Sequence, residues 1–189
     1  SRRLVAENNL STDDLILPLF VCEGNNVEDP IKSMPGVSRY SIDKLLNKVE
    51  EAVRFSIPAI AIFPQIEPSL KNAEGSLAYD ENNLVCRSIK NIKKEFSGIG
   101  IICDVALDPF TDHGHDGLVI NDKIDNDKTL DILEKQALVQ VHAGCDVIAP
   151  SDMMDGRVGR IRKVLDSNSF QDTLILSYAA KYASAFYGP

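Results

Sequence analysis

The sequence has no apolar run near the ~18 residues that a membrane-spanning helix requires, and it shows no secretory signal pattern. It is also short of basic residues, with 20 Lys and Arg against 28 Asp and Glu, so its net charge is −8. This balance argues against a nucleic-acid-binding surface. The one basic cluster, at 157–163, is interpreted as the solvated face of a helix. We therefore expect no membrane span and no nucleic-acid partner.

Cysteine is sparse, and no pair has the C-x-x-C spacing of zinc clusters and redox motifs. The four cysteines are Cys22, Cys86, Cys103 and Cys145. Their wide spacing argues against a zinc cluster and predicts reduced, mostly buried thiols. The sequence therefore favours a cytoplasmic protein.

The chain contains apolar segments of strand length that alternate with segments of helical periodicity. With 189 residues and 44% hydrophobic residues, it is long enough for one good core. Strands are predicted at 14–21, 57–63, 100–107, 145–149 and 173–177, and helices at 42–53, 84–96, 130–141 and 155–165. Such alternation predicts a parallel sheet with helices outside it. The strands are apolar enough for both sheet faces to be buried, and 22–36 is predicted to be a polar loop.

The number of predicted strands bears on the fold class. A (β/α)8 TIM barrel needs ~250 residues, so five strands in 189 residues predict an incomplete α/β barrel, either a fragment or a chain whose remainder is missing from this sequence. Residues 1–10 would be the end of an N-terminal arm, and 11–189 the first part of the barrel domain. Such a piece would leave sheet edges unpaired, so we expect it to aggregate and to be inactive alone. A complete flavodoxin-like sheet is the rival, but its connections are shorter than the strand spacing here.

Lys181 follows the fifth predicted strand, within the stretch LILSYAAKYASAFYGP. One interpretation is a Schiff-base lysine at the carboxyl mouth of the barrel, since burial favours the neutral, nucleophilic amine. The alternative is a lysine whose stem packs between tyrosines while its ammonium group reaches water.

Acidic residues are concentrated after the third predicted strand. Asp104, Asp108 and Asp116 could hold a hard cation such as Mg²⁺ or tune a nearby lysine, or they could form a solvated acidic loop. His113 and His115 fit no zinc signature and are interpreted as loop histidines that form hydrogen bonds or titrate.

The loop after the fourth predicted strand has the sequence APSDMMDGR. Ser151 and Asp152 are expected to point into the barrel mouth. Asp155 is a candidate helix N-cap, and Met153 and Met154 are interpreted as core residues.

Three long motifs, DVALDPFTDHGHDG, APSDMMDGRVGRIR and SYAAKYASAFYGP, resemble in this order the 5-aminolevulinate dehydratase (porphobilinogen synthase) family. LILPLFV, SMPGVSRYSID and IPAIAIFP are also similar to that family, so the resemblance covers essentially the whole chain. It implies a (β/α)8 barrel with an N-terminal arm and a large homo-oligomer, usually an octamer. It also implies condensation of two 5-aminolevulinate molecules to porphobilinogen, with loss of two waters, in tetrapyrrole biosynthesis.

The resemblance assigns roles to individual residues. Lys181 matches the first of two Schiff-base lysines; the second lies in a Met-Val-Lys-Pro-Gly motif that this sequence lacks. Asp104, Asp108 and Asp116 would position the substrate amino group and manage protons. The substrate-binding candidates are Ser151, Asp152 and Tyr178.

The resemblance also bears on the metal. Zinc-dependent members have three cysteines where this chain has Ala106, Asp108 and Asp116, so the resemblance implies the branch without catalytic zinc. Magnesium or a monovalent cation is implied instead, with Asp108 and Asp116 as candidate ligands and Asp152 near an allosteric magnesium. Two alternatives to this enzyme are a lysine-dependent aldolase on the same barrel and a non-catalytic assembly subunit.

Overall fold

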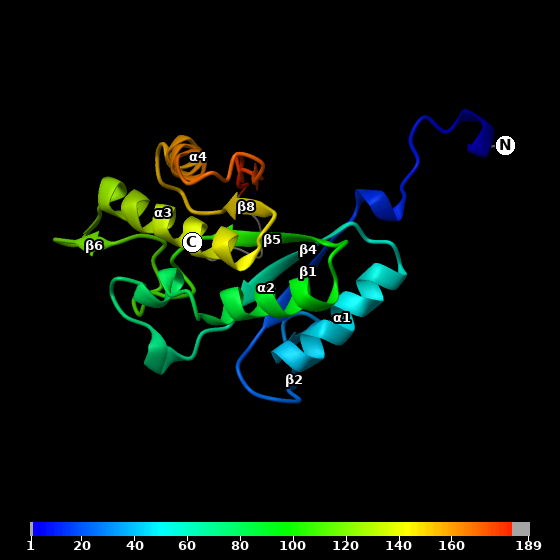
Figure 1. Cartoon of the computed structure of the whole chain (residues 1–189), viewed down its shortest axis with the longest axis horizontal. Coiled ribbons are helices and arrows are strands. Elements are labelled where there is room, and N and C mark those ends of the chain that lie inside the picture. Colours follow the sequence, from blue (N-terminus) through cyan, green and yellow to red (C-terminus); the bar gives the residue numbers. More distant parts are fainter. Residues whose placement is uncertain (1, 183–189) are drawn as a thin grey trace.

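The computed structural model describes residues 2–182 and shows strands and helices alternating along the chain (Figure 1). The strands are β1 (Ile16–Val21), β2 (Glu28–Pro30), β3 (Ser38–Tyr40), β4 (Ala59–Pro64), β5 (Gly100–Val105), β6 (Val119–Ile120), β7 (Lys123–Ile124), β8 (Val147–Pro150) and β9 (Leu174–Ile175). The α-helices are α1 (Ile42–Arg54), α2 (Leu84–Glu95), α3 (Asn126–Ala143) and α4 (Arg157–Ser167). Short 3-10 helices occur at η1 (Arg2–Val5), η2 (Thr12–Asp14), η3 (Pro68–Leu70) and η4 (Ser76–Tyr79). None of the helices within this part of the chain is long and apolar enough to cross a lipid bilayer.

The main sheet has the strand order β2-β3-β1-β4-β5-β8-β9. From β1 to β9 the neighbours follow the order of the chain and are parallel. A doubly wound sheet such as flavodoxin reverses its strand order, which this sheet does not do. Parallel strands added one after another, each through a helix on the same side, form the successive units of a (β/α)8 barrel. The structure therefore has the predicted barrel-type arrangement and not the flavodoxin-like one.

The helices cover one face of the sheet, and that face forms the core. Ile60 and Ile62 on β4 and Ile101 and Cys103 on β5 are 0–1% exposed beneath the helices. On the other face, Phe63 of β4 is only partly buried, whereas Ile102 of β5 is 5% exposed. The expectation that both sheet faces are buried is therefore wrong at β4, whose second face no helix covers, but it holds at Ile102 of β5.

The segment before β1 lies outside this core. Residues from η1 to η2 extend away from the body of the molecule (Figure 1). Leu4, Val5 and Leu10 are 78–85% exposed there. The described part of residues 1–10 thus carries exposed apolar side chains outside the core, and its assignment as the end of an N-terminal arm stays a prediction.

Several short strands were missed. β2 lies inside the predicted polar loop and pairs with β3, and three-residue strands are too short to produce a readable alternation. The loop after β5 contains the β6–β7 hairpin, whose turn residues Asn121 and Asp122 both have positive φ. The fifth barrel strand, predicted over 173–177, is only two residues long.

Glycines in the left-handed conformation stand at two helix ends. Gly144 ends α3 with φ +111°. Asp155 is not the N-cap of α4, because Gly156 takes that position with φ +82°. Of the two methionines expected in the core, Met154 is buried but Met153 is 69% exposed.

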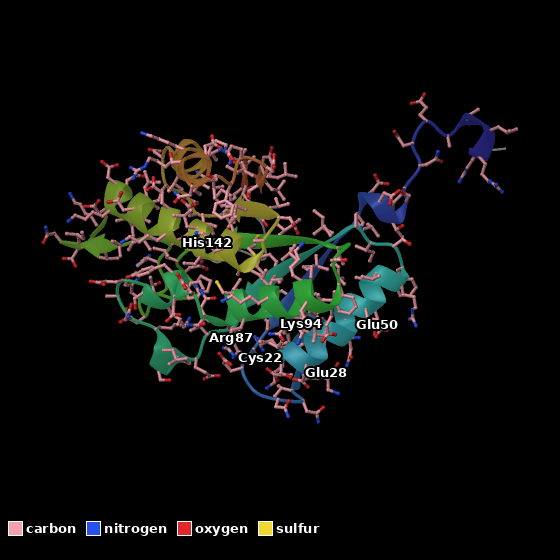
Figure 2. All side chains as sticks on the ribbon, in the orientation of Figure 1. Cys22, Glu28, Glu50, Arg87, Lys94 and His142 are labelled. Carbon is pink, nitrogen blue, oxygen red and sulfur yellow. The ribbon has the colours of Figure 1, made fainter. Side chains whose placement is uncertain are left out.

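The basic cluster on α4 is more than a solvated face. Arg160 pairs with Asp131 at 2.7 Å and with Glu134, both on α3. These ion pairs connect α4 to α3. Charged residues such as Glu50 on α1 and Lys94 on α2 do project into solvent, whereas Arg87 on α2 pairs with Glu23 (Figure 2).

The four cysteines are free and buried, as predicted. Burial raises the pKa of the Cys86 thiol to about 11 and also raises the pKa of Cys22 and Cys103. Thiols with raised pKa values are poor nucleophiles and poor metal ligands at neutral pH. They are core residues.

Candidate active site

An open pocket of about 680 Å³ lies beyond the carboxyl ends of β4, β5 and β8. Its position is where barrel enzymes place their chemistry. Charged and polar side chains from β5 and from the segments that follow β5, β8 and β9 line it, together with apolar side chains. The lining residues are Phe63, Asp104, Asp108, Gly114, His115, Asp116, Ile124, Ser151, Met153, Met154, Tyr178 and Lys181.

Lys181 reaches this pocket from the segment that follows β9. Its Nζ donates a hydrogen bond to the backbone carbonyl of Ser151. The side chain is exposed, so the expectation that burial activates the amine is wrong for the described residues. The open strand face explains this, because nothing within residues 2–182 covers the lysine from the far side. The final part of its motif, 183–189, lies outside the described residues.

The strand that carries the carboxylates is fixed from behind by α3. Gln140 Nε2 donates to the carbonyl of Asp104 (2.8 Å), and Gln136 Nε2 donates to the carbonyl of Ala106 (3.1 Å). Both glutamines are 1% exposed. Buried amides that satisfy carbonyls at a strand end leave that end little freedom to move. Helix α3 thereby fixes the backbone at the end of β5, from which the aspartates of the pocket project.

The three predicted aspartates meet in this pocket. Burial raises the pKa of Asp104 to about 6, and the neighbouring Asp108 adds to the effect, while hydrogen bonds from Ser151 and the charge of Lys181 oppose it. Burial raises the pKa of Asp116 to about 7, although the backbone N–H of Leu107 donates to its carboxylate at 2.8 Å. Burial also raises the pKa of Asp108, and Lys181 lowers it.

These pKa values make the carboxyl groups suited to proton transfer. A group that titrates between about 6 and 7 can both accept and donate a proton near neutral pH. Lys181 is close enough for its charge to act on Asp104 and Asp108. The arrangement is therefore an amine beside three carboxyl groups within one pocket, and two of them, Asp104 and Asp116, can exchange protons near neutral pH.

Ser151, Tyr178 and Asp152 lie in different surroundings. Ser151 and Tyr178 line the pocket, as expected for substrate-binding candidates. Asp152 is fully buried and does not line it. Its Oδ1 accepts from the backbone N–H of Met154 at 2.7 Å, and its Oδ2 lies 3.6 Å from Nε of Arg157. The expectation that Asp152 points into the mouth is wrong, because its buried carboxylate contacts these partners and does not line the pocket.

Sequence reasoning missed part of the pocket. His115 lines it, and its backbone N–H donates to Nδ1 of His113, whose Nε2 lies 3.3 Å from the carbonyl of Ala73. The prediction of a loop histidine that forms hydrogen bonds through its ring is therefore confirmed for His113. Phe63 and Ile124 were not foreseen. Alternation along β4 identifies the face of Phe63, but no sequence signal brings the β6–β7 hairpin to the pocket.

A metal site was also expected here. Asp108 and Asp116 both face the pocket, and hard cations prefer oxygen ligands. Within residues 2–182, however, no three His, Cys, Asp or Glu side chains form a group that could hold a metal ion. Two carboxylates alone do not make a magnesium site, which uses about six oxygen ligands. The described residues therefore do not form a metal centre by themselves.

The raised pKa of Asp104 should make folding stability depend on pH. In the folded protein the carboxyl group of Asp104 keeps its proton up to a pH of about 6, whereas the ordinary pKa of an aspartate is 3.8. The stability that the proton contributes is full below about 3.8 and is lost as pH rises through about 6, because the carboxyl group must then ionise inside the protein.

Replacing Asp104 with Asn should remove this dependence, because an amide cannot ionise. We expect Tm of the Asp104→Asn variant, relative to wild type, to rise by a few degrees between pH 5 and 7.5, about 2–4 °C for each kcal/mol. Thermal unfolding at both pH values measures it. The exposed Asp172, changed to Asn, is the matched control. A constant difference between Asp104→Asn and wild type would contradict the prediction.

The sequence matches the family described as delta-aminolevulinic acid dehydratase over residues 1–189. It is 59% identical over its whole length to the delta-aminolevulinic acid dehydratase of Bradyrhizobium diazoefficiens, and it covers 54% of that protein. It is 45% identical to the enzyme of Chlamydia pneumoniae, of which it covers 57%. The chain thus spans a little over half the length of these relatives.

The fold agrees with a solved structure. The chain matches delta-aminolevulinic acid dehydratase (porphobilinogen synthase) of Toxoplasma gondii ME49, solved with its reaction product porphobilinogen, with a TM-score of 0.95 and 45% identity. The match covers 99% of this chain and 53% of that one. The fold is therefore that of the corresponding part of a TIM-barrel enzyme, and the chain belongs to the delta-aminolevulinic acid dehydratase family.

Proposed function

We propose that the native protein containing this chain is a lyase that condenses two 5-aminolevulinate molecules to porphobilinogen, with loss of two waters, in tetrapyrrole biosynthesis. The observation that carries the proposal is the meeting of Lys181 with Asp104, Asp108 and Asp116 in one pocket. The lysine-dependent aldolase would share the lysine but gives no reason for the three carboxyl groups. The family's second Schiff-base lysine motif is not in this sequence.

Lys181 is the proposed nucleophile toward one substrate ketone. The amine loses a proton, adds to the carbonyl carbon, and forms a carbinolamine that expels water to give an imine. Asp104 and Asp108, whose pKa values respond to the lysine charge, are placed to take up and return these protons. An ionised carboxylate beside the imine nitrogen favours its protonated form, which acidifies the adjacent carbon.

The test traps the imine. The native protein is incubated with 5-aminolevulinate, reduced with borohydride and mapped by peptide mass spectrometry. The expected result is a substrate-derived mass on the peptide that contains Lys181. An adduct confined to other lysines would remove the central assignment.

We propose a hard cation, magnesium or monovalent, with Asp108 and Asp116 among its ligands, and no catalytic zinc. The ligand types in the pocket support this proposal. Among the described residues, carboxylate groups line the pocket and no cysteine does, and oxygen ligands suit hard cations. Other ligands would have to complete the coordination shell. We also propose that Asp152 belongs to the surroundings of an allosteric magnesium and not to its direct ligands, because its buried carboxylate already pairs with Arg157.

Zinc removal should leave activity unchanged. Treatment with a zinc-selective chelator, followed by a porphobilinogen assay and metal analysis, measures this. Magnesium depletion and re-addition form the parallel arm, in which activity should fall and recover. Inhibition that zinc reverses and magnesium does not would contradict the donor-set argument.

We further propose a cytoplasmic homo-oligomer, an octamer by the family resemblance. The exposed apolar arm residues Leu4, Val5 and Leu10 support assembly, because monomers rarely expose such side chains together. The four free cysteines support a reducing compartment. Light scattering on the native protein tests the assembly.

A further inference from the structure

Arg157, the first residue of α4, joins two loops of the pocket. Its Nη1 donates to the carbonyl of Met154 at 3.1 Å, and its Nη2 donates to the carbonyl of Tyr178 at 3.3 Å. Met154 belongs to the loop after β8, and Tyr178 belongs to the segment that carries Lys181. One guanidinium group therefore bridges the loop that lies beneath the lysine and the segment that presents it.

The buried carboxylate of Asp152 holds this guanidinium in place. Asp152 is fully buried, and its Oδ2 lies 3.6 Å from Nε of Arg157, whose side chain is 18% exposed. Neither of these two atoms has a hydrogen-bond partner in the described structure. A carboxylate with no exposure requires a counter-charge, so Arg157 and Asp152 are bound to each other by charge even without an ideal hydrogen bond.

The segment that this bridge reaches has little regular structure of its own. β9 pairs with β8 only at Leu174 and Ile175, and the N–H of Leu176 then donates to the carbonyl of Ile148. Residues 177–182 follow with no helix or strand. The position of Lys181 within this segment therefore depends on side-chain contacts, of which the Arg157 bond to Tyr178 is one.

We propose that Arg157 is a positioning residue for Lys181: it fixes the lysine-bearing segment over the pocket through the Tyr178 carbonyl and anchors itself on Asp152. The inference deepens the proposed function and rests on it. Arg157 does not touch the pocket's reacting groups, so its effect passes through the placement of the lysine amine. A displacement of about 1 Å at a reacting group can cost on the order of 10²-fold in rate.

The chain supplies a matched control on the same helix. Arg162 donates to the carbonyls of Thr173 (2.6 Å) and Phe170 (2.8 Å), just before β9. Arg162 thus donates to backbone carbonyls as Arg157 does, but to carbonyls that precede β9, whereas Lys181 follows β9. Arg162 and Arg157 variants lose similar contacts but differ in whether the lysine-bearing segment is released.

The experiment compares Arg157→Ala, Arg157→Lys and Arg162→Ala with wild type in the native protein. The rate of borohydride-trapped adduct formation on Lys181 with 5-aminolevulinate, the separate kcat and KM values, and Tm are measured. We expect Arg157→Ala to slow adduct formation roughly ten- to hundred-fold, with kcat lowered more than KM is raised. Arg157→Lys, which keeps the charge beside Asp152, should recover part of the rate. Arg162→Ala should lower Tm and leave adduct formation at the wild-type rate.

Four outcomes would count against the proposal. A wild-type rate of trapping in Arg157→Ala overturns it, and so does an equal slowing in Arg162→Ala, which would indicate a general loss of stability. If wild type forms no adduct on Lys181, the proposed function fails and this inference falls with it. Should Arg157→Ala not fold, Arg157→Lys and Arg157→Gln take its place, and wild-type trapping rates in both would overturn the positioning role.

Discussion

Replacing Lys181 with Arg should abolish porphobilinogen formation and the borohydride-trapped adduct together. The guanidinium keeps the positive charge beside Asp104 and Asp108 but is not deprotonated in proteins, so it cannot add to a ketone. We expect kcat to fall by on the order of 10⁴-fold or more, the scale seen when a covalent nucleophile is removed. The assay is product formation, with mass spectrometry of the reduced protein.

Lys163→Arg is the matched control, because Lys163 is exposed on α4 and does not line the pocket. It should retain wild-type activity and the adduct. Since Lys181 is itself exposed, its replacement should leave Tm nearly unchanged. Residual activity in Lys181→Arg within tenfold of wild type would show that the pocket amine is not the nucleophile.

Replacing Asp116 with Asn should remove the acid limb of the pH–rate profile that lies near pH 7. Burial raises the pKa of Asp116 to about 7, helped by the charges of Asp108, Asp152 and Asp104. The group is therefore protonated below that pH and cannot accept a proton, so kcat should rise as pH passes through about 7. Losing a general acid–base group costs roughly 10²-fold or more, and we expect a fall of that size.

The asparagine keeps an oxygen that can accept from the backbone N–H of Leu107, so the loop should stay in place. Asp112→Asn is the control in the same loop, since Asp112 is exposed and does not line the pocket. It should leave the profile as it is. Steady-state rates from pH 5 to 9 measure both variants. An unchanged midpoint near 7 in Asp116→Asn would assign that ionisation to another group.

The arrangement of strands and the pocket carboxylates could be predicted from local sequence. Alternating apolar segments indicated the parallel sheet, and Asp104, Asp108 and Asp116 follow a strand end, where the topology of a barrel brings them together. The burial of the Asp152 side chain outside the pocket could not be predicted in this way. Its neighbour Ser151 faces the pocket while Asp152 turns beneath the loop, and that choice depends on Arg157 five residues later.

Exposure was the other property that local pattern could not determine. The apolar residues of β1 and β9 are typical of strands buried on both faces, but burial depends on what packs against them and not on their own composition. Ile16 is 47% exposed and Leu174 is 64% exposed. The environment of Lys181 is open for the same reason, although its place at the pocket was correctly predicted.

Helix α3 does more than pack against β5, because two of its glutamines donate hydrogen bonds to backbone carbonyls at the end of that strand. Gln136 and Gln140 lie one turn apart, so one helix face supplies both amides. A helix of equal length and apolarity, transplanted from another barrel protein, would fill the same space and leave two carbonyls unsatisfied. Anyone who redesigns or recombines this barrel must therefore transfer α3 and β5 together, even though neither glutamine lines the pocket.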